Sequence, residues 1–341
     1  MLQDNLLNTF AIQYYVMDSK AIFSIQDPID FEEVALQVFE LQYNNNPVYQ
    51  LFCTYLKKSP ENVATLNDIP FLPIEFFKSK KILSSSKKVE KVFTSSGTTG
   101  MATSKHYVAE MLVYEESYLK CFESFYGPAE EYIILALLPS YLEREGSSLI
   151  YMVNDLIKKS GYPESGFYLH NHSELAEKLV ALDRGDRKVL LIGVSFALLD
   201  LVEKYKFGLN NTIIMETGGM KGRRKELIRE ELHAVLCEGF GINKIHSEYG
   251  MTELLSQAYS YGDGFFKCPP WMKVLIRDTE DPLTLQAIGK TGGLNIIDLA
   301  NIHSCSFIAT QDLGKVCNDN TFTVLGRFDN SDIRGCNLMV I

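Results

Sequence analysis

Short apolar runs alternate with amphipathic segments along the middle of the chain. The runs are 132–138, 189–194 and 212–215. Nearly all-apolar runs of this length are typical of strands covered on both faces. The segments that follow them, 147–158, 197–205 and 223–237, carry apolar residues at helical spacing, and Gly239 and Gly241 end the last one. The alternation predicts an α/β core with a mostly parallel sheet flanked by helices.

The two ends of the chain follow other patterns. Residues 1–85 favour helices, and 69–78 is an apolar segment twice interrupted by proline, which excludes a central strand and indicates an extended segment packed on the main body. After about residue 270 only short strand-like runs remain. We therefore expect a helical lead-in packed on the core at 1–85, an α/β nucleotide-binding core at 86–270, and a smaller β subdomain with a C-terminal tail at 271–341.

Composition narrows the class of protein. The chain has 341 residues, 46% hydrophobic residues and a net charge of −10, so a broad basic surface for nucleic acid is not expected. No run approaches the about 18 apolar residues of a membrane span, and the N-terminus lacks the pattern of a signal peptide. Seven scattered cysteines without a Cys-x-x-Cys pair argue against a disulfide framework or a zinc site. We expect a cytoplasmic protein.

A loop of hydroxyl-bearing and glycine residues follows the apolar pair Val92-Phe93. Its members are Thr94, Ser95, Ser96, Gly97, Thr98, Thr99 and Gly100. Such a loop offers backbone N–H groups and hydroxyl donors to a phosphate chain, and Lys105 adds a nearby cation. The Walker A pattern does not fit it. The loop alone leaves a surface linker open as the alternative.

Two further motifs lie downstream. The segment 247–253 ends a predicted strand, where open α/β sheets place their ligands, and it offers an aromatic face at Tyr249, a hydroxyl at Thr252 and a carboxylate at Glu253. Asp312, within 310–314, can accept from a ribose diol, and Arg327 can pin a sugar or phosphate. Each motif alone is weak evidence for a binding site. An Asp-Leu-Gly sequence, for example, is usually a turn.

In their order and spacing these motifs resemble the adenylate-forming superfamily of acyl- and aryl-CoA ligases, luciferases and adenylation domains. Within it the chain looks most like the bacterial bioluminescence acyl-protein synthetases, which activate fatty acids. That closer likeness rests on Ile69-Pro70-Phe71-Leu72-Pro73, Glu216-Thr217-Gly218-Gly219-Met220-Lys221 and Ser331-Asp332-Ile333-Arg334-Gly335-Cys336. The resemblance spans roughly residues 65 to 341 and implies the superfamily's N-terminal-domain architecture.

The resemblance implies a site for ATP and Mg2+. The loop from Thr94 to Gly100 would wrap the β- and γ-phosphates, and Lys105 matches the lysine that follows it. Gly218, Gly219 and Tyr249 would flank the adenine. Thr252 would contact the α-phosphate, Glu253 would hold magnesium, and Asp312, supported by Arg327, would bind the ribose.

The sequence departs from the superfamily in two places. Gln311 replaces the usual glycine before Asp312. The chain ends shortly after Gly326-Arg327, so we expect the usual mobile C-terminal domain to be absent, as in the short acyl-protein synthetases. In that branch a cysteine near the C-terminus carries the acyl group, which makes Cys336 the candidate nucleophile, with an inert cysteine as the alternative. His106 and His246 could line an acyl pocket, although satisfied core histidines are the simpler interpretation.

We therefore expect ATP-dependent activation of a carboxylic acid, a fatty acid by resemblance, to an acyl-adenylate, followed by acyl transfer to a thiol of a protein. Two alternatives remain: an acyl- or aryl-CoA or carrier-protein ligase that works with a partner chain, and an inactive nucleotide-binding subunit of a larger complex. The expected partners are a small carboxylic acid and an acyl-accepting protein or reductase, and the sequence leaves a homo-oligomer open.

Overall fold

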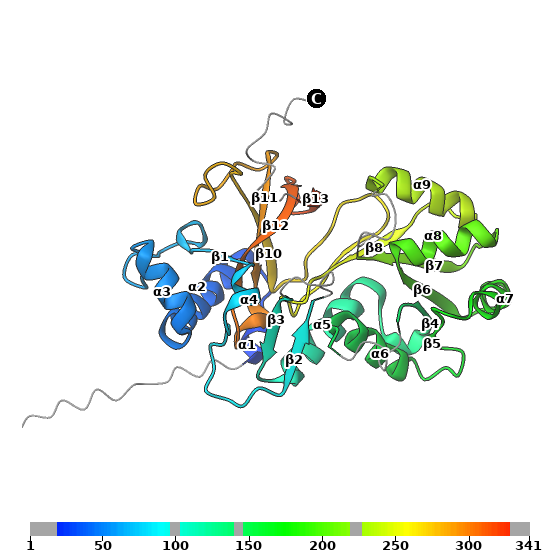
Figure 1. The fold of residues 1–341 in the computed structure, drawn as a ribbon, viewed down its shortest axis with the longest axis horizontal. Coiled ribbons are helices and arrows are strands. Elements are labelled where there is room, and N and C mark those ends of the chain that lie inside the picture. The colour runs from blue at the N-terminus through cyan, green and yellow to red at the C-terminus, as the bar shows by residue number, and fades with distance from the viewer. Residues whose placement is uncertain (1–18, 96–102, 140–145, 219–226, 328–341) are drawn as a thin grey trace, which may run out of the picture.

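Two sheets, one in each lobe of the molecule, organise the fold (Figure 1). The computed structural model describes residues 19–95, 103–139, 146–218 and 227–327. The middle of the chain builds the lobe that contains the larger sheet. The N-terminal helices and the last strands together build the other lobe (Figure 1).

The larger sheet has six strands in the order β5-β4-β6-β7-β8-β9 and is parallel except for β9. The strands are β4 (Tyr132–Leu137), β5 (Gly166–Phe167), β6 (Lys188–Val194), β7 (Thr212–Thr217), β8 (His246–Tyr249) and β9 (Ala258–Ser260). All six residues of β4 are buried. The apolar runs predicted as buried strands therefore form the centre of a parallel sheet, as their composition requires.

Helices cover both faces of this sheet. They are α5 (Met111–Tyr126), α6 (Ser148–Ser160), α7 (His172–Asp183), α8 (Ser195–Lys204) and α9 (Arg229–Phe240). Figure 1 shows α8 and α9 over one face and α5 and α6 over the other. The Ser147 hydroxyl accepts from the Ile150 N–H at the start of α6, a typical N-cap. The predicted α/β core is confirmed.

The helix predicted at 223–237 exists as α9, but it begins at Arg229 and continues to Phe240. Gly239 does not end the helix; it lies in the last turn, where a Cβ would stand 2.4 Å from the Cβ of Val202, so glycine lets α8 approach closely. The helix ends at Gly241, whose φ of 71° suits a left-handed cap. Ile228 and Val235, two of the apolar residues at helical spacing in the predicted helix 223–237, do not pack inward as that spacing predicts but are exposed. Residues 223–226 lie outside the described part of the chain.

The second sheet is antiparallel except at one edge. Its strands are β10 (Met272–Arg277), β11 (Thr291–Asp298), β12 (Phe307–Val316), β13 (Phe322–Arg327) and β1 (Leu72–Pro73). The two-residue β1 pairs parallel with β12, with Leu72 opposite Ile308, so the proline-interrupted segment forms an edge strand. Asp312, Leu313 and Gly314 lie inside β12. The usual turn for an Asp-Leu-Gly sequence is thus the wrong interpretation here.

The N-terminal helices pack against this second sheet. The helical elements are α1 (Ser19–Phe23), α2 (Pro28–Asn45), α3 (Pro47–Tyr55), α4 (Phe76–Ser79) and the 3-10 turn η1 (Leu66–Asp68). The buried Gln42 amide in α2 donates to the carbonyls of Asn301 and Ile302, at 3.0 and 3.1 Å. The predicted domain boundaries at residues 85 and 270 remain predictions. The first and the last predicted domain share one sheet, because β1 pairs with β12.

A two-stranded hairpin lies beside the place where the two lobes meet. It pairs β2 (Lys91–Thr94) with β3 (Lys105–Val108), and Thr94 stands opposite Lys105. Two further 3-10 turns are η2 (Ala129–Glu131) and η3 (Leu299–Asn301). Among the helices that the structure describes, none is long and apolar enough to span a lipid bilayer.

Candidate active site

The hairpin holds both ends of the Ser/Thr/Gly loop together. The Ser95 N–H donates to the Ser104 carbonyl at 3.1 Å, and the Ser104 N–H donates to the Ser95 hydroxyl at 3.0 Å. The Thr94 N–H donates to the Gly146 carbonyl at 2.7 Å. Lys105, opposite Thr94, is exposed to solvent. Of the predicted loop, Ser96, Gly97, Thr98, Thr99 and Gly100 lie outside the described residues.

The segment after β8 carries Thr252 and Glu253, and side chains from distant elements hold its backbone. His106 Nδ1 lies 2.8 Å from the carbonyl oxygen of Thr252. The Asn301 amide donates to the carbonyl of Glu253 at 2.7 Å. The buried carboxylate of Asp298 accepts from the N–H groups of Leu255 and Ser256, at 2.7 and 3.1 Å. The irregular backbone here is thus satisfied by side chains, as a buried loop requires.

The Glu253 side chain brings two of the predicted motifs together. It is 6% exposed, and burial raises the pKa of its carboxyl above the ordinary value. A hydrogen bond with Ser104, beside Lys105, opposes that rise, and so do the positive charges of Arg327 and Lys78. The β2–β3 hairpin therefore meets the Thr252–Glu253 segment, and Arg327 is near enough to act on the same carboxylate.

This carboxylate fits a role as a magnesium ligand. It is a hard oxygen donor, its burial disfavours the uncompensated anion, and a cation would relieve that cost. Over the described ranges no group of three histidine, cysteine or acidic side chains could hold a metal alone. Magnesium bound with nucleotide phosphates takes only one or two protein carboxylates, so a single glutamate is enough.

Tyr249, Asp312 and Arg327 form one connected group. The Tyr249 phenol donates to Asp312 Oδ2 at 2.7 Å, and Arg327 Nε donates to Asp312 Oδ1 at 3.1 Å. Burial, followed by the charge of Asp312, raises the pKa of Tyr249 well above its ordinary value, so the phenol keeps its proton and remains a donor. The Tyr249 ring packs against Phe266 and Phe322, with centroids at 5.8 and 5.4 Å.

Gly218 stands at the carboxyl end of β7. It is exposed, its φ is 64°, and its carbonyl accepts from the Ser195 hydroxyl at 2.6 Å. The carboxyl ends of β6, β7 and β8 thus carry Ser195, Gly218 and Tyr249, which is where parallel sheets bind ligands. Gly219 and Cys336 lie outside the described residues, so their predicted roles stay predictions.

An ion pair between the buried Glu216 and the half-buried Arg229, near Gly218, was not predicted from the sequence. Arg229 Nη1 contacts Glu216 Oε1 at 2.7 Å and donates to the Ser247 hydroxyl at 3.0 Å. Burial alone would raise the pKa of Glu216, but contacts with His233 and Arg229 outweigh it and lower that pKa. Glu216 and Ser247 both stand in motifs that the sequence singled out, but Arg229 lies on a surface helix without any local pattern that marks it.

The two histidines differ in their surroundings. His246 is buried, its Nδ1 lies 3.1 Å from the Tyr126 hydroxyl, and burial lowers its pKa to about 4. It is therefore a neutral core histidine with a partner. His106 is also fully buried, but it contacts the Thr252–Glu253 segment, which makes it part of the framework of the site.

Solved structures of other proteins share this fold. An open conformation of 2-hydroxyisobutyryl-CoA ligase, in complex with 2-HIB-AMP and CoA, is 12% identical, with a TM-score of 0.64 over 89% of this chain and 70% of that one. ATP-bound MatB from Rhodopseudomonas palustris is 14% identical, with a TM-score of 0.53 over 71% of this chain. The match covers 49% of the MatB chain, about half its length. The fold is that of the adenylate-forming ligases.

Sequence comparison points to one branch. The family described as "Acyl-protein synthetase, LuxE" matches residues 2–115. A long-chain-fatty-acid–luciferin-component ligase of Vibrio harveyi is 24% identical over 326 residues, covering 88% of this chain and 84% of the relative. The enzyme of the same name from Aliivibrio fischeri is 25% identical over 308 residues, covering 84% and 79%. The predicted resemblance to acyl-protein synthetases is confirmed.

Proposed function

We propose that this protein is an ATP-dependent ligase that converts a fatty acid to an acyl-adenylate and passes the acyl group to a protein thiol. The observation that carries the proposal is the position of Asp312. It accepts at 2.7 Å from Tyr249, the last residue of the strand that leads to Glu253, and Arg327 donates to it at 3.1 Å. Two motifs that are far apart in the sequence, 247–253 and the one that carries Asp312 and Arg327, meet there. Relatives named as fatty-acid ligases support the substrate class.

The first step makes the carboxylate reactive. A carboxylate is a poor electrophile because its leaving group would be oxide. One carboxylate oxygen attacks the α-phosphorus of ATP, the bond to the bridging oxygen breaks, and pyrophosphate leaves with that electron pair. The product is a mixed anhydride of the acid and AMP, from which AMP is a good leaving group.

The chain's own residues would bind and orient the nucleotide. Asp312 accepts from the ribose hydroxyls while Arg327 holds it in place, and Gly218 and Gly219 with Tyr249 flank the adenine. The loop from Thr94 to Gly100 wraps the β- and γ-phosphates. Lys105 and Thr252 place a cation and a hydroxyl donor at the phosphates, where charge builds in the transition state.

Glu253 would hold the magnesium ion. When bound, Mg2+ neutralises phosphate charge and favours departure of pyrophosphate. The buried carboxylate beside Ser104 supports this assignment, since burial raises its pKa even though the charges of Arg327 and Lys78 oppose the rise, and a bound cation would offset the cost of burying the anion.

In the second step a thiolate attacks the acyl carbon, the bond to the phosphate oxygen breaks, and AMP leaves. We assign the thiol to Cys336, because Arg334 nearby in the sequence favours the thiolate. An acyl-accepting reductase or other partner protein would then take the group. We also propose a cytoplasmic location. Measurement of the protein's size in solution tests whether it forms a homo-oligomer.

Carboxylate-dependent exchange of pyrophosphate into ATP tests the first step. We expect exchange with long-chain fatty acids in a panel that also contains aryl and hydroxy acids. Absence of exchange with every acid would favour the inactive nucleotide-binding subunit. Formation of free acyl-CoA, with no acyl-protein, would favour the acyl- or aryl-CoA ligase that works with a partner chain.

A further inference from the structure

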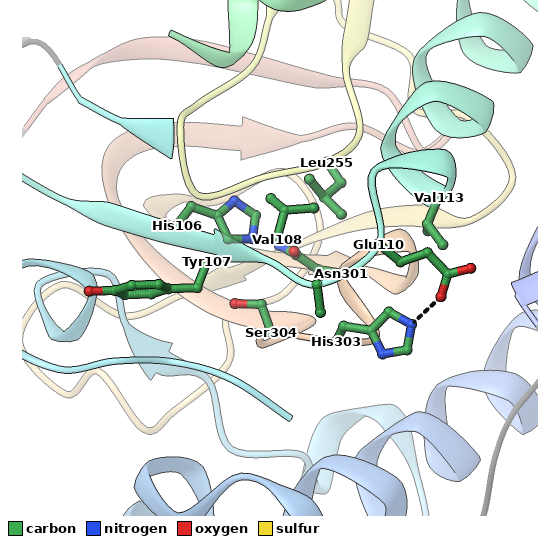
Figure 2. A pocket seen from close by; sticks show the side chains of 10 residues that line it. His106, Tyr107, Val108, Glu110, Val113, Leu255, Asn301, His303 and Ser304 are labelled. Carbon is green, nitrogen blue, oxygen red and sulfur yellow. Dashed lines mark hydrogen bonds and ion pairs between the residues drawn. The ribbon is translucent and has the colours of Figure 1, made fainter. Parts of the chain in front are cut away.

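A small cavity lies behind the Thr252–Glu253 segment, where β3 faces η3. It has about 10 Å³ of room for the centre of a water molecule, and Figure 2 shows His106 and Asn301 among the side chains that line it. Both side chains are fully buried. His106 Nε2 and Asn301 Oδ1 have no hydrogen-bond partner among the residues that the structure describes. Buried polar atoms are rarely left unpaired, so these two need an explanation.

The proton of His106 can be located from its contacts. Nδ1 lies 2.8 Å from the carbonyl oxygen of Thr252, and a carbonyl can only accept, so Nδ1 carries the hydrogen. Burial lowers the pKa of His106 to about 4, so the ring is neutral near pH 7. Nε2 therefore presents a lone pair and is an acceptor.

The Asn301 amide is oriented in the same way. Its Nδ2 donates to the Glu253 carbonyl at 2.7 Å, which leaves Oδ1 as a second acceptor. Because Nδ1 already carries a hydrogen, His106 can donate to Asn301 directly only when Nε2 is protonated as well. A hydrogen bond to Asn301 favours this charged form of the ring, but burial lowers the pKa of His106 by more. Two acceptors cannot bond to each other, so a donor of two hydrogens is required between them.

We propose that one bound water molecule donates to both His106 Nε2 and Asn301 Oδ1 and completes a clamp on the Thr252–Glu253 segment. The room in the cavity is close to the smallest that holds one water, and two polar partners are enough to fix it. The clamp fixes the consecutive carbonyls of Thr252 and Glu253. His106 and Asn301 are thus positioning residues, a role that rests on the proposed function.

The clamp also couples two parts of the site. His106 follows Lys105 directly in β3, so its hydrogen bond ties the strand that carries the lysine to the segment that carries Thr252 and Glu253. The Asn301 amide in η3 donates to the carbonyl of Glu253. Asp298, at the start of η3, accepts from the N–H groups of Leu255 and Ser256. A small displacement of such a framework can cost about 100-fold in rate.

The water and the tautomer can be tested without an activity assay. In a high-resolution crystal structure of the full chain we expect one ordered water within hydrogen-bonding distance of both atoms. Nitrogen-15 NMR of the histidine side chains at pH 7 should show His106 as the neutral ring protonated at Nδ1, assigned by its loss in His106→Gln. A ring protonated at Nε2, or no density between the two atoms, overturns the clamp.

Paired variants test the positioning role. Asparagine can place a donor where Nδ1 stands, whereas glutamine reaches toward Nε2, so we expect His106→Gln to lower kcat for exchange about 10- to 100-fold and His106→Asn to recover much of the loss. The KM for ATP should change far less than kcat. His303→Gln is the matched control, since His303 lines the same cavity but contacts Glu110, and its rate should equal wild type.

The outcomes separate this inference from the proposed function. If no acid supports exchange in the wild-type protein, the proposed function fails while the crystal and NMR results still decide the clamp. Equal loss in His106→Gln and His106→Asn, with unchanged melting temperatures, overturns the positioning role of the Nδ1 hydrogen bond. Restored kcat in His106→Asn supports it.

Discussion

The phenol of Tyr249 donates a hydrogen bond to Asp312 at 2.7 Å, and through it the end of the parallel sheet is joined to the middle of the antiparallel one. The two residues are 63 positions apart and belong to different motifs. Since both are buried, this contact fixes where the Asp312 carboxylate stands relative to the segment with Thr252 and Glu253.

Removing this hydroxyl should weaken both stability and nucleotide binding. In Tyr249→Phe, Asp312 keeps its contact with Arg327 but loses a neutral donor in a buried place. Hydrogen bonds to charged groups contribute about 1.5–3 kcal/mol, so the free energy of unfolding should fall by that amount. Urea denaturation measures it, and the KM for ATP in the exchange assay should rise. Tyr55→Phe, at a side chain that is 78% exposed, should change neither.

The carboxylate of Glu253 can be neutralised without changing its size. Glu253→Gln should lower the exchange rate by about 100-fold or more, because the carboxylate that would hold the magnesium ion at the phosphates is lost. The backbone bond from Asn301 to the Glu253 carbonyl does not involve the side chain, so the melting temperature should change little. Glu280→Gln, an exposed control, should match wild type. A Glu253→Gln enzyme within a few-fold of wild type at saturating magnesium contradicts the assignment.

The sequence was sufficient for the elements whose burial follows from local pattern. The run that became β4 is apolar throughout, and a run of this length is typical of a strand covered on both faces. The proline-interrupted segment could be excluded from a sheet interior for the same kind of local reason, and it forms the two-residue edge strand β1.

Contacts between distant segments decided the rest. Asp312 lies in a strand because β11 and β13 pair with β12 on either side, which no local turn preference reveals. His106 could be noticed beside Lys105, but its partner is 146 residues away. Asn301 stands 48 residues from the carbonyl that it holds, in a segment without a motif. Such framework residues become visible only when the chain is folded.

A second buried carboxyl predicts a pH dependence of stability. Glu248 is 7% exposed and accepts a hydrogen bond from the Thr217 hydroxyl. Burial raises its pKa from 4.5 to about 7; the Thr217 hydrogen bond opposes the rise and the charge of Glu216 adds to it. Between these two values the folded protein holds a proton that the unfolded chain has released, so stability falls as pH rises.

Replacing this carboxyl should remove that dependence. The contribution of Glu248 is fully present below about pH 4.5 and is lost as pH rises through about 7, a change on the order of 3 kcal/mol. In Glu248→Gln the side chain is neutral at every pH, so relative to wild type it should gain that amount between pH 5 and pH 8.5. Urea unfolding at both pH values measures the gain. Glu238→Gln, at an exposed position, should follow wild type, and parallel curves for Glu248→Gln contradict the raised pKa.

The identity of the acyl acceptor can be tested separately from activation. Because the adenylate forms before any thiol reacts, Cys336→Ser should retain wild-type pyrophosphate exchange and lose covalent labelling by a tagged fatty acid and ATP. The label on wild-type protein should be released by neutral hydroxylamine, as expected for a thioester. Cys317→Ser, a half-buried cysteine in the same region of the chain, should keep both activities. Labelling that persists in Cys336→Ser would move the acceptor to another residue. Unlabelled wild-type protein that instead makes free acyl-CoA would replace the protein acceptor with a soluble thiol.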